Sequence, residues 1–89
     1  MRYLHEDLGH QQSGAVVHVS LRGNAANVLL LDSTNLGRYQ RGQRYSYHGG
    51  QVKRSPFRVF VPRSGHWHVV VDLGGYAGNV SASVQVLPA

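Results

Sequence analysis

Strict two-residue alternation over residues 65–74 is the feature that most constrains how this 89-residue chain can fold. One side of the run is apolar and consists of Trp67, Val69, Val71 and Leu73. The other side carries His66, His68, Val70 and Asp72. Because successive side chains of a strand point to opposite faces, the pattern predicts a central β-strand with an apolar face toward the core and a polar face opposite.

Similar short segments recur along the rest of the chain. They cover residues 2–5, 15–22, 26–32, 43–48, 57–61 and 79–87. Turn-forming sequences separate them, including Asp7-Leu8-Gly9 and the glycine pair Gly49-Gly50, which we expect to end the fourth segment. No segment keeps a 3.6-residue period, and residues 35–39 have room for at most one helical turn. The sequence therefore predicts an all-β fold, an antiparallel β-sandwich or small jelly-roll-like barrel of six to eight short strands.

Length and composition narrow the class further. A chain of 89 residues forms one domain with a modest core, so we assign residues 1–89 to a single unit. The chain has no cysteine, which excludes disulfides, thiolate metal sites and cysteine nucleophiles. No run approaches the ~20 apolar residues that span a bilayer, and the first residues resemble no signal peptide. We expect a soluble, cytoplasmic protein without a membrane partner.

The middle of the chain is strongly basic. The net charge is +5, and residues 36–63 contain seven cations and no acid. These are Arg38, Arg41, Arg44, Lys53, Arg54, Arg58 and Arg63. Such a block predicts either a basic surface for an acidic ligand or protein partner, or a solvated face that aids solubility. Nucleic acid is one such partner, although no nucleic-acid-binding motif is present and the neighbouring aromatic residues alternate toward the core.

His66 and His68 form the second candidate site. Two histidines two residues apart share one face of a strand and can bind a metal ion together. Asp72 lies four residues beyond His68, about 13 Å along a strand, too far to share the ion. A third ligand would have to come from the remaining histidines, His5, His10, His18 and His48. The alternative interpretation is a pair of half-exposed histidines that only contact neighbouring strands.

Motifs for catalysis are absent from the sequence. No Gly-x-Ser-x-Gly segment occurs, and the glycine-rich stretches lack the following helix or Gly-Lys-Ser/Thr ending that phosphate binding requires. We therefore predict no catalytic residues and no cofactor. The leading interpretation is a non-enzymatic recognition module that binds an acidic ligand through its basic surface. A metal-binding protein or metal-dependent enzyme using the histidine pair, and a self-associating structural domain, are the alternatives.

Several stretches resemble a known bacterial family. They are Leu8-Gly9-His10, Gly23-Asn24-Ala25-Ala26-Asn27-Val28, Gly49-Gly50, Val52-Lys53-Arg54-Ser55-Pro56 and residues 62–78. Together they are similar to the family catalogued as domain of unknown function 1883. The resemblance implies a compact β-sandwich-like domain that occurs alone or joined to a TIR domain. It supplies no catalytic residues, and the TIR association suits a recognition role.

Overall fold

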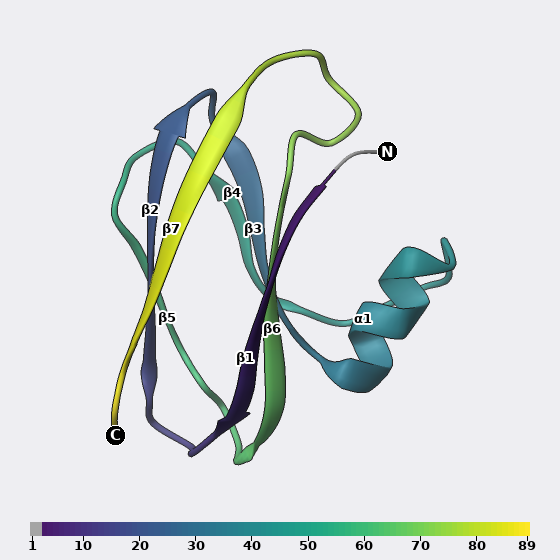
Figure 1. Ribbon diagram of the computed structural model, residues 1–89. Helices are drawn as coiled ribbons and strands as arrows, with labels where there is room; N and C mark the ends of the chain where they lie inside the picture. Colours follow the sequence, from purple (N-terminus) through teal and green to yellow (C-terminus); the bar gives the residue numbers. More distant parts are fainter. Residues whose placement is uncertain (1–2) are drawn as a thin grey trace.

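The computed structural model describes residues 3–89, which form seven β-strands and one α-helix (Figure 1). In chain order the elements are β1 (Tyr3–Gln11), β2 (Val16–Gly23), β3 (Ala26–Asp32), α1 (Ser33–Gln40), β4 (His48–Val52), β5 (Phe57–Phe60), β6 (Gly65–Asp72) and β7 (Val80–Leu87).

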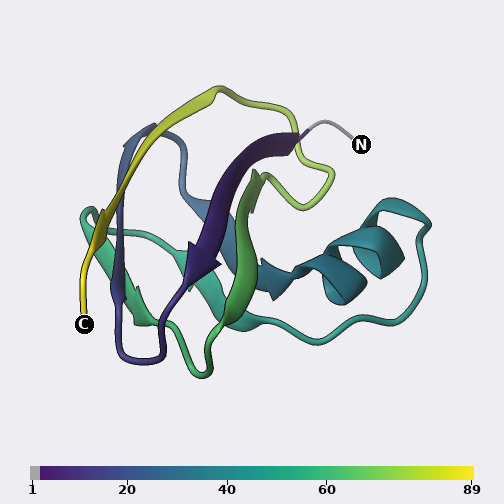
Figure 2. The same ribbon diagram turned by 60° about the horizontal axis from the view of Figure 1, so that its bottom comes forward.

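The strands form two antiparallel sheets. One sheet has the order β1-β6-β3-β4, and the other has the order β5-β2-β7. The sheets face each other, and α1 projects from the outer side of the four-stranded sheet (Figures 1 and 2). The predicted all-β, antiparallel sandwich class is confirmed.

The main core lies between the sheets and follows the predicted alternation. Trp67, Val69 and Val71 of β6 are each 2% exposed and pack in this core. Facing residues come from β2 and β3, chiefly Val17, Val19, Val28 and Leu30. The apolar face predicted for residues 65–74 is therefore the face that holds the two sheets together.

The helix α1 covers the outer face of the four-stranded sheet and is longer than predicted. It has eight residues, about two turns, where at most one turn was expected. Its buried residues are Leu36 and Tyr39, which pack on Leu29, Leu31 and Val70 in a second small core. Only two of its eight residues are apolar and face the sheet. The sequence therefore shows no clear 3.6-residue hydrophobic period, and the second turn could not be predicted. No helix within residues 3–89 is long and apolar enough to cross a membrane.

The first strand is also longer than expected. Residues 2–5 were predicted as a short edge strand before a turn; residue 2 lies outside the described residues, and β1 continues to Gln11. The expected turn at residues 7–9 is instead a β-bulge, where the register with β6 shifts between Asp7 and Gly9. Gly9 has a φ of +67°, a left-handed value that a bulge commonly takes. The glycine therefore bends the strand without ending it.

The strand predicted at residues 43–48 is wrong in position. This segment follows α1 as irregular chain, and its backbone is tied to the helix: Ser46 N–H donates to Asn35 Oδ1 at 2.8 Å. The strand β4 starts at His48 and includes the glycine pair that was expected to end it. Gly49 has a φ of +124°, and a Cβ there would overlap the Val28 carbonyl oxygen of β3. The glycine permits close pairing with β3.

Candidate functional site

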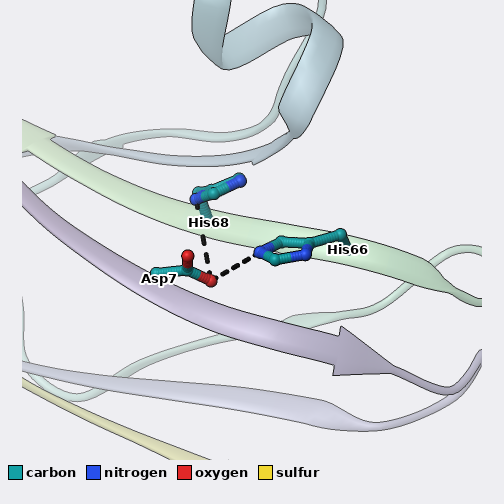
Figure 3. Close-up of side chains that lie close together, drawn as sticks. All are labelled: Asp7, His66 and His68. Carbon is teal, nitrogen blue, oxygen red and sulfur yellow. Dashed lines mark hydrogen bonds and ion pairs between the residues drawn. The ribbon is translucent and has the colours of Figure 1, made fainter.

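Antiparallel pairing of β1 with β6 brings an acid and two histidines together on the outer face of the four-stranded sheet. Asp7 lies opposite His68 in the register, and His66 precedes His68 by two residues on the same face. One potential ligand atom from each of these three residues lies within 4.8 Å of the others. Figure 3 shows the Asp7 carboxylate pointing between the two imidazole rings.

The β-bulge orients the Asp7 carboxylate. Asp7 Oδ1 accepts a hydrogen bond from the Gly9 backbone N–H at 2.8 Å and lies 2.6 Å from His66 Nε2. Since a carboxylate only accepts, His66 Nε2 carries the proton of the second bond. The Gly9 N–H and then the His66 contacts hold the pKa of Asp7 below its usual value. The group is thus ionised at neutral pH, and its half-exposed position favours the same state.

His68 is the buried member of the cluster, at 6% exposure. Its Nε2 is 2.9 Å from Ser33 Oγ at the start of α1, and its Nδ1 is 3.0 Å from His5 Nε2. Burial lowers the pKa of His68, and the nearby Asp7 charge opposes this only in part. The imidazole is therefore neutral at pH 7, the form that ligates metals.

Three imidazole rings lie in a row across the two strands. The His66 and His68 rings stack with centroids 4.8 Å apart, and the His5 ring lies 5.1 Å from His68 on the other side. His68 is thus packed between two rings and below the first turn of α1. These contacts restrict its side chain to one orientation, with Nδ1 toward His5 and, farther away, Asp7, and with Nε2 toward Ser33 at the start of the helix.

The spacing of the three ligand atoms suits a divalent metal ion. Zn²⁺ bound tetrahedrally at 2.0–2.1 Å would separate its ligand atoms by about 3.3 Å. Asp7 Oδ1 is 2.6 Å from His66 Nε2 and 4.0 Å from His68 Nδ1, so these two of the three separations are within about 0.7 Å of that value. The third separation, between the two histidines, is at most 4.8 Å, and rotation of the exposed Asp7 and His66 side chains would bring the three atoms to the tetrahedral spacing. The Ser33 hydroxyl would then accept from Nε2 of the ligating His68, the outer hydrogen bond typical of metal-bound histidines.

The structure brings the predicted histidine pair together, but the third partner differs from those expected. Asp7 was missed, because it was assigned to a turn and its approach depends on long-range strand pairing. Of the proposed third ligands, His5 contacts His68 and His10 lies opposite His66 in the register. The other two lie elsewhere: His18 is on β2 of the opposite sheet, and His48 packs against Trp67 with ring centroids 6.0 Å apart. The expectation that both histidines are half-exposed holds for His66 and is wrong for His68, which α1 covers.

Asp72 stays outside the cluster, as its sequence spacing predicted, and has a structural role. Its carboxylate is 4% exposed and accepts from the Tyr39 hydroxyl at 2.7 Å, the Asn27 side chain at 2.9 Å and the Gly74 backbone at 2.9 Å. Burial, followed by the bond to Asp72, raises the pKa of Tyr39 far above its usual value. The three donors satisfy the buried carboxylate, and the Tyr39 hydroxyl attaches α1 to β6.

The seven cations are spread over several parts of the molecule. Arg38 lies in α1, Arg41 and Arg44 follow it, Lys53 and Arg54 lie between β4 and β5, Arg58 is on β5 of the other sheet, and Arg63 lies between β5 and β6. Of these seven, Arg63 is the one with an ion pair among residues 3–89, to Asp32. Its guanidinium also lies 4.9 Å from the centroid of the Trp67 ring. The structure thus places the seven cations on α1, on three connecting segments and on β5, whereas the cluster of Asp7, His66 and His68 is compact.

Comparison with known families covers the whole chain. A family model described as "Domain of unknown function (DUF1883)" matches residues 1–89. The chain belongs to this family. No curated protein and no solved structure matches the chain.

Proposed function

We propose that this DUF1883 domain binds one divalent first-row metal ion through Asp7 Oδ1, His66 Nε2 and His68 Nδ1. The observation that carries the proposal is the convergence of these three atoms within 4.8 Å from two strands far apart in the sequence. Two imidazoles and one carboxylate are a donor set used for Zn²⁺ and for non-haem Fe²⁺. This is the metal-binding alternative raised by the histidine pair, with Asp7 as the third ligand.

The surroundings of the cluster favour binding. His68 is neutral and oriented by Ser33, so it needs no deprotonation, and the metal would replace the contact of its Nδ1 with His5 Nε2. On binding, the proton on His66 Nε2 would be replaced by one on Nδ1, so that the Nε2 lone pair meets the metal in place of the hydrogen bond to Asp7. Asp7 supplies one negative charge against the two of the ion. Because Asp7 and His66 are about half exposed, a fourth position of the metal would face solvent.

Calorimetric titration of untagged protein with Zn²⁺ tests the proposal. We expect one ion per chain, with binding lost in His66→Ala and His68→Ala. His18→Ala is the matched control, since it also removes one histidine but from the opposite sheet. Binding weaker than about 1 mM in the wild type, or equal loss in His18→Ala, would contradict the proposal.

Binding of an acidic ligand stays a prediction, and it now concerns three of the seven cations. Arg38, Arg41 and Arg44 lie on α1 and the segment that follows it, and none of them has an ion-pair partner among residues 3–89. Polyanion titration at low and moderate salt, with Arg41→Glu and Arg44→Glu as variants, tests whether this group binds an acidic partner. Unchanged weak binding in both variants would exclude it.

The origin and cellular location of the protein are also predictions. We infer a bacterial, cytoplasmic domain, with association with TIR domains implied by the family resemblance. The absence of cysteine supports a reducing compartment. Fractionation of the source cells with an antibody against this domain would test the location.

A further inference from the structure

One edge of the sandwich is open and regular. The strand β7 is the last of the three-stranded sheet and pairs with β2 alone, over all eight of its residues from Val80 to Leu87. Figures 1 and 2 show β7, in yellow, at the margin of the molecule with β1 in the opposite sheet beside it. Among residues 3–89, no strand pairs with the backbone N–H and C=O groups on the outer side of β7, which makes this edge a template for another strand.

The other three sheet edges carry features that oppose strand addition. The edge of β1 is interrupted by the bulge at residues 7–9 and bears acidic side chains. The edge of β4 is five residues long and contains two glycines with positive φ. The edge of β5 is four residues long, contains Arg58 and lies between Pro56 and Pro62. Bulges, charges, prolines and short length are the usual protections of an edge, and β7 has none of them.

The sequence of β7 matches itself in the antiparallel direction. Its inward residues Val80, Ala82, Val84 and Val86 are half-buried, and its outward residues Ser81, Ser83 and Gln85 are exposed and neutral. Consider two copies of β7 side by side and antiparallel, with Ser83 of one copy opposite Ser83 of the other. Apolar residues then pair across the strands as Val80 with Val86 and Ala82 with Val84. The outward pairs are Ser81 with Gln85 and Ser83 with Ser83.

Charge selects a second copy as the occupant. The chain has a net charge of +5, so most surfaces of two copies repel each other, while β7 contributes no charge at all. An acidic or basic partner would gain no ion pair from β7 itself. A hollow of about 240 Å³ beside β7 is lined by Ala82 and Val84 of this strand and, from the opposite sheet, by apolar residues together with His5 and Glu6. A neutral, self-matching strand next to it fits an identical strand best.

We propose that two copies of this domain pair through their β7 edges, antiparallel and with Ser83 on the two-fold axis. The pairing joins two three-stranded sheets into one continuous six-stranded sheet. It uses the sheet opposite the metal cluster, so it does not depend on the proposed metal site. Every measurement below includes EDTA, so bridging by metal ions cannot produce the result.

Single-cysteine variants test the register, since the wild-type chain contains no cysteine. In Ser83→Cys the two sulfurs face each other within the Cα separation of a disulfide. In Ser81→Cys the two cysteines lie four residues apart along the pair, about 13 Å, which is beyond disulfide reach. Under mild oxidation at equal concentration we expect Ser83→Cys to cross-link at least about tenfold faster than Ser81→Cys. Equal rates would overturn the register.

Charge complementation tests the interface itself. We expect wild-type protein to show a concentration-dependent dimer in sedimentation velocity, and Ser83→Lys and Ser83→Glu each to be monomeric at the same concentrations. Mixing the two variants should restore a dimer, because opposite charges then face each other. Ser20→Lys is the matched control: it adds the same charge on the same face of the sheet, one strand away from the edge, and should still dimerise. A wild-type monomer at every concentration, or no dimer in the mixture, would overturn the proposal.

Discussion

Trp67→Ala should remove a large part of the stability of this domain. Trp67 is the only tryptophan, is 2% exposed and lies in the core between the sheets. Its indole N–H donates to the Arg63 carbonyl at 2.9 Å, and the Arg63 guanidinium covers the ring. Truncation of a buried tryptophan to alanine costs about 3–5 kcal/mol through lost burial and the cavity left behind.

The cost of Trp67→Ala is large compared with the unfolding free energy of the whole domain. A domain of 89 residues has an unfolding free energy of about 4–13 kcal/mol, at 0.05–0.15 kcal/mol per residue. The melting temperature should fall by at least about 12 °C, at about 4 °C or more per kcal/mol for a domain of this size. Circular dichroism during thermal and urea unfolding measures both quantities without relying on the tryptophan signal.

Trp67→Phe separates packing from the hydrogen bond. It keeps most of the ring in the core and leaves the Arg63 carbonyl without its donor, so we expect a loss of about 1–2 kcal/mol. The reasoning would be refuted if Trp67→Ala lowered the unfolding free energy by less than about 1 kcal/mol, because the face of β6 that carries Trp67 would then not be the core face.

Three further changes test other parts of the fold. Tyr39→Phe leaves the buried Asp72 carboxylate one donor short and should cost about 1–3 kcal/mol in urea unfolding, and an unchanged midpoint would show that Asp72 does not need this donor. Gly49→Ala places a Cβ against the β3 backbone and should destabilise the protein more than Gly50→Ala, which meets no atom; equal losses would argue against the close approach of β4 to β3. Burial alone would raise the pKa of Asp32, but the hydrogen bonds from Asn35 and Arg63 outweigh burial and lower this pKa. The ionised Asp32 therefore contributes its full share of the unfolding free energy above the usual pKa of 3.8. That share is lost as the pH falls through the lower pKa of the folded state. The stability difference between wild type and Asp32→Asn should therefore be largest near neutral pH and shrink below about pH 4, and a difference that grows on acidification would contradict this sign.

Local pattern predicted much of the sandwich because each strand follows its own alternation. The core face of β6 and the limits of β3 follow directly from the order of apolar residues. The second turn of α1 could not be predicted, since it is stabilised by Tyr39 bonding to Asp72, a residue 33 positions away. The glycine pair in β4 was misassigned because a turn and a close strand approach both require positive φ, and the sequence does not distinguish them.

Only part of the candidate site could be predicted, because only part of it follows from local sequence spacing. His66 and His68 share a face by local spacing alone, so the pair could be predicted. Asp7 joins them only through the register of β1 on β6, and residues 7 and 68 are separated by about two-thirds of the chain. The burial of His68 depends on α1 covering a sheet face that looked polar and therefore exposed. A polar side chain on a strand can thus mark a covered site when a helix supplies its hydrogen-bond partner, here Ser33.

The most direct test of metal binding is NMR of the six histidine rings in ¹⁵N-labelled protein during Zn²⁺ addition. The structure predicts that His66 Nε2 and His68 Nδ1 move to the shifts of metal-bound nitrogens at one equivalent. With Nδ1 on the metal, His68 Nε2 should carry the proton, directed at Ser33, while the His18 and His48 rings stay unchanged. Similar shifts in all six rings, or metal-bound shifts confined to histidines other than His66 and His68, would contradict the site.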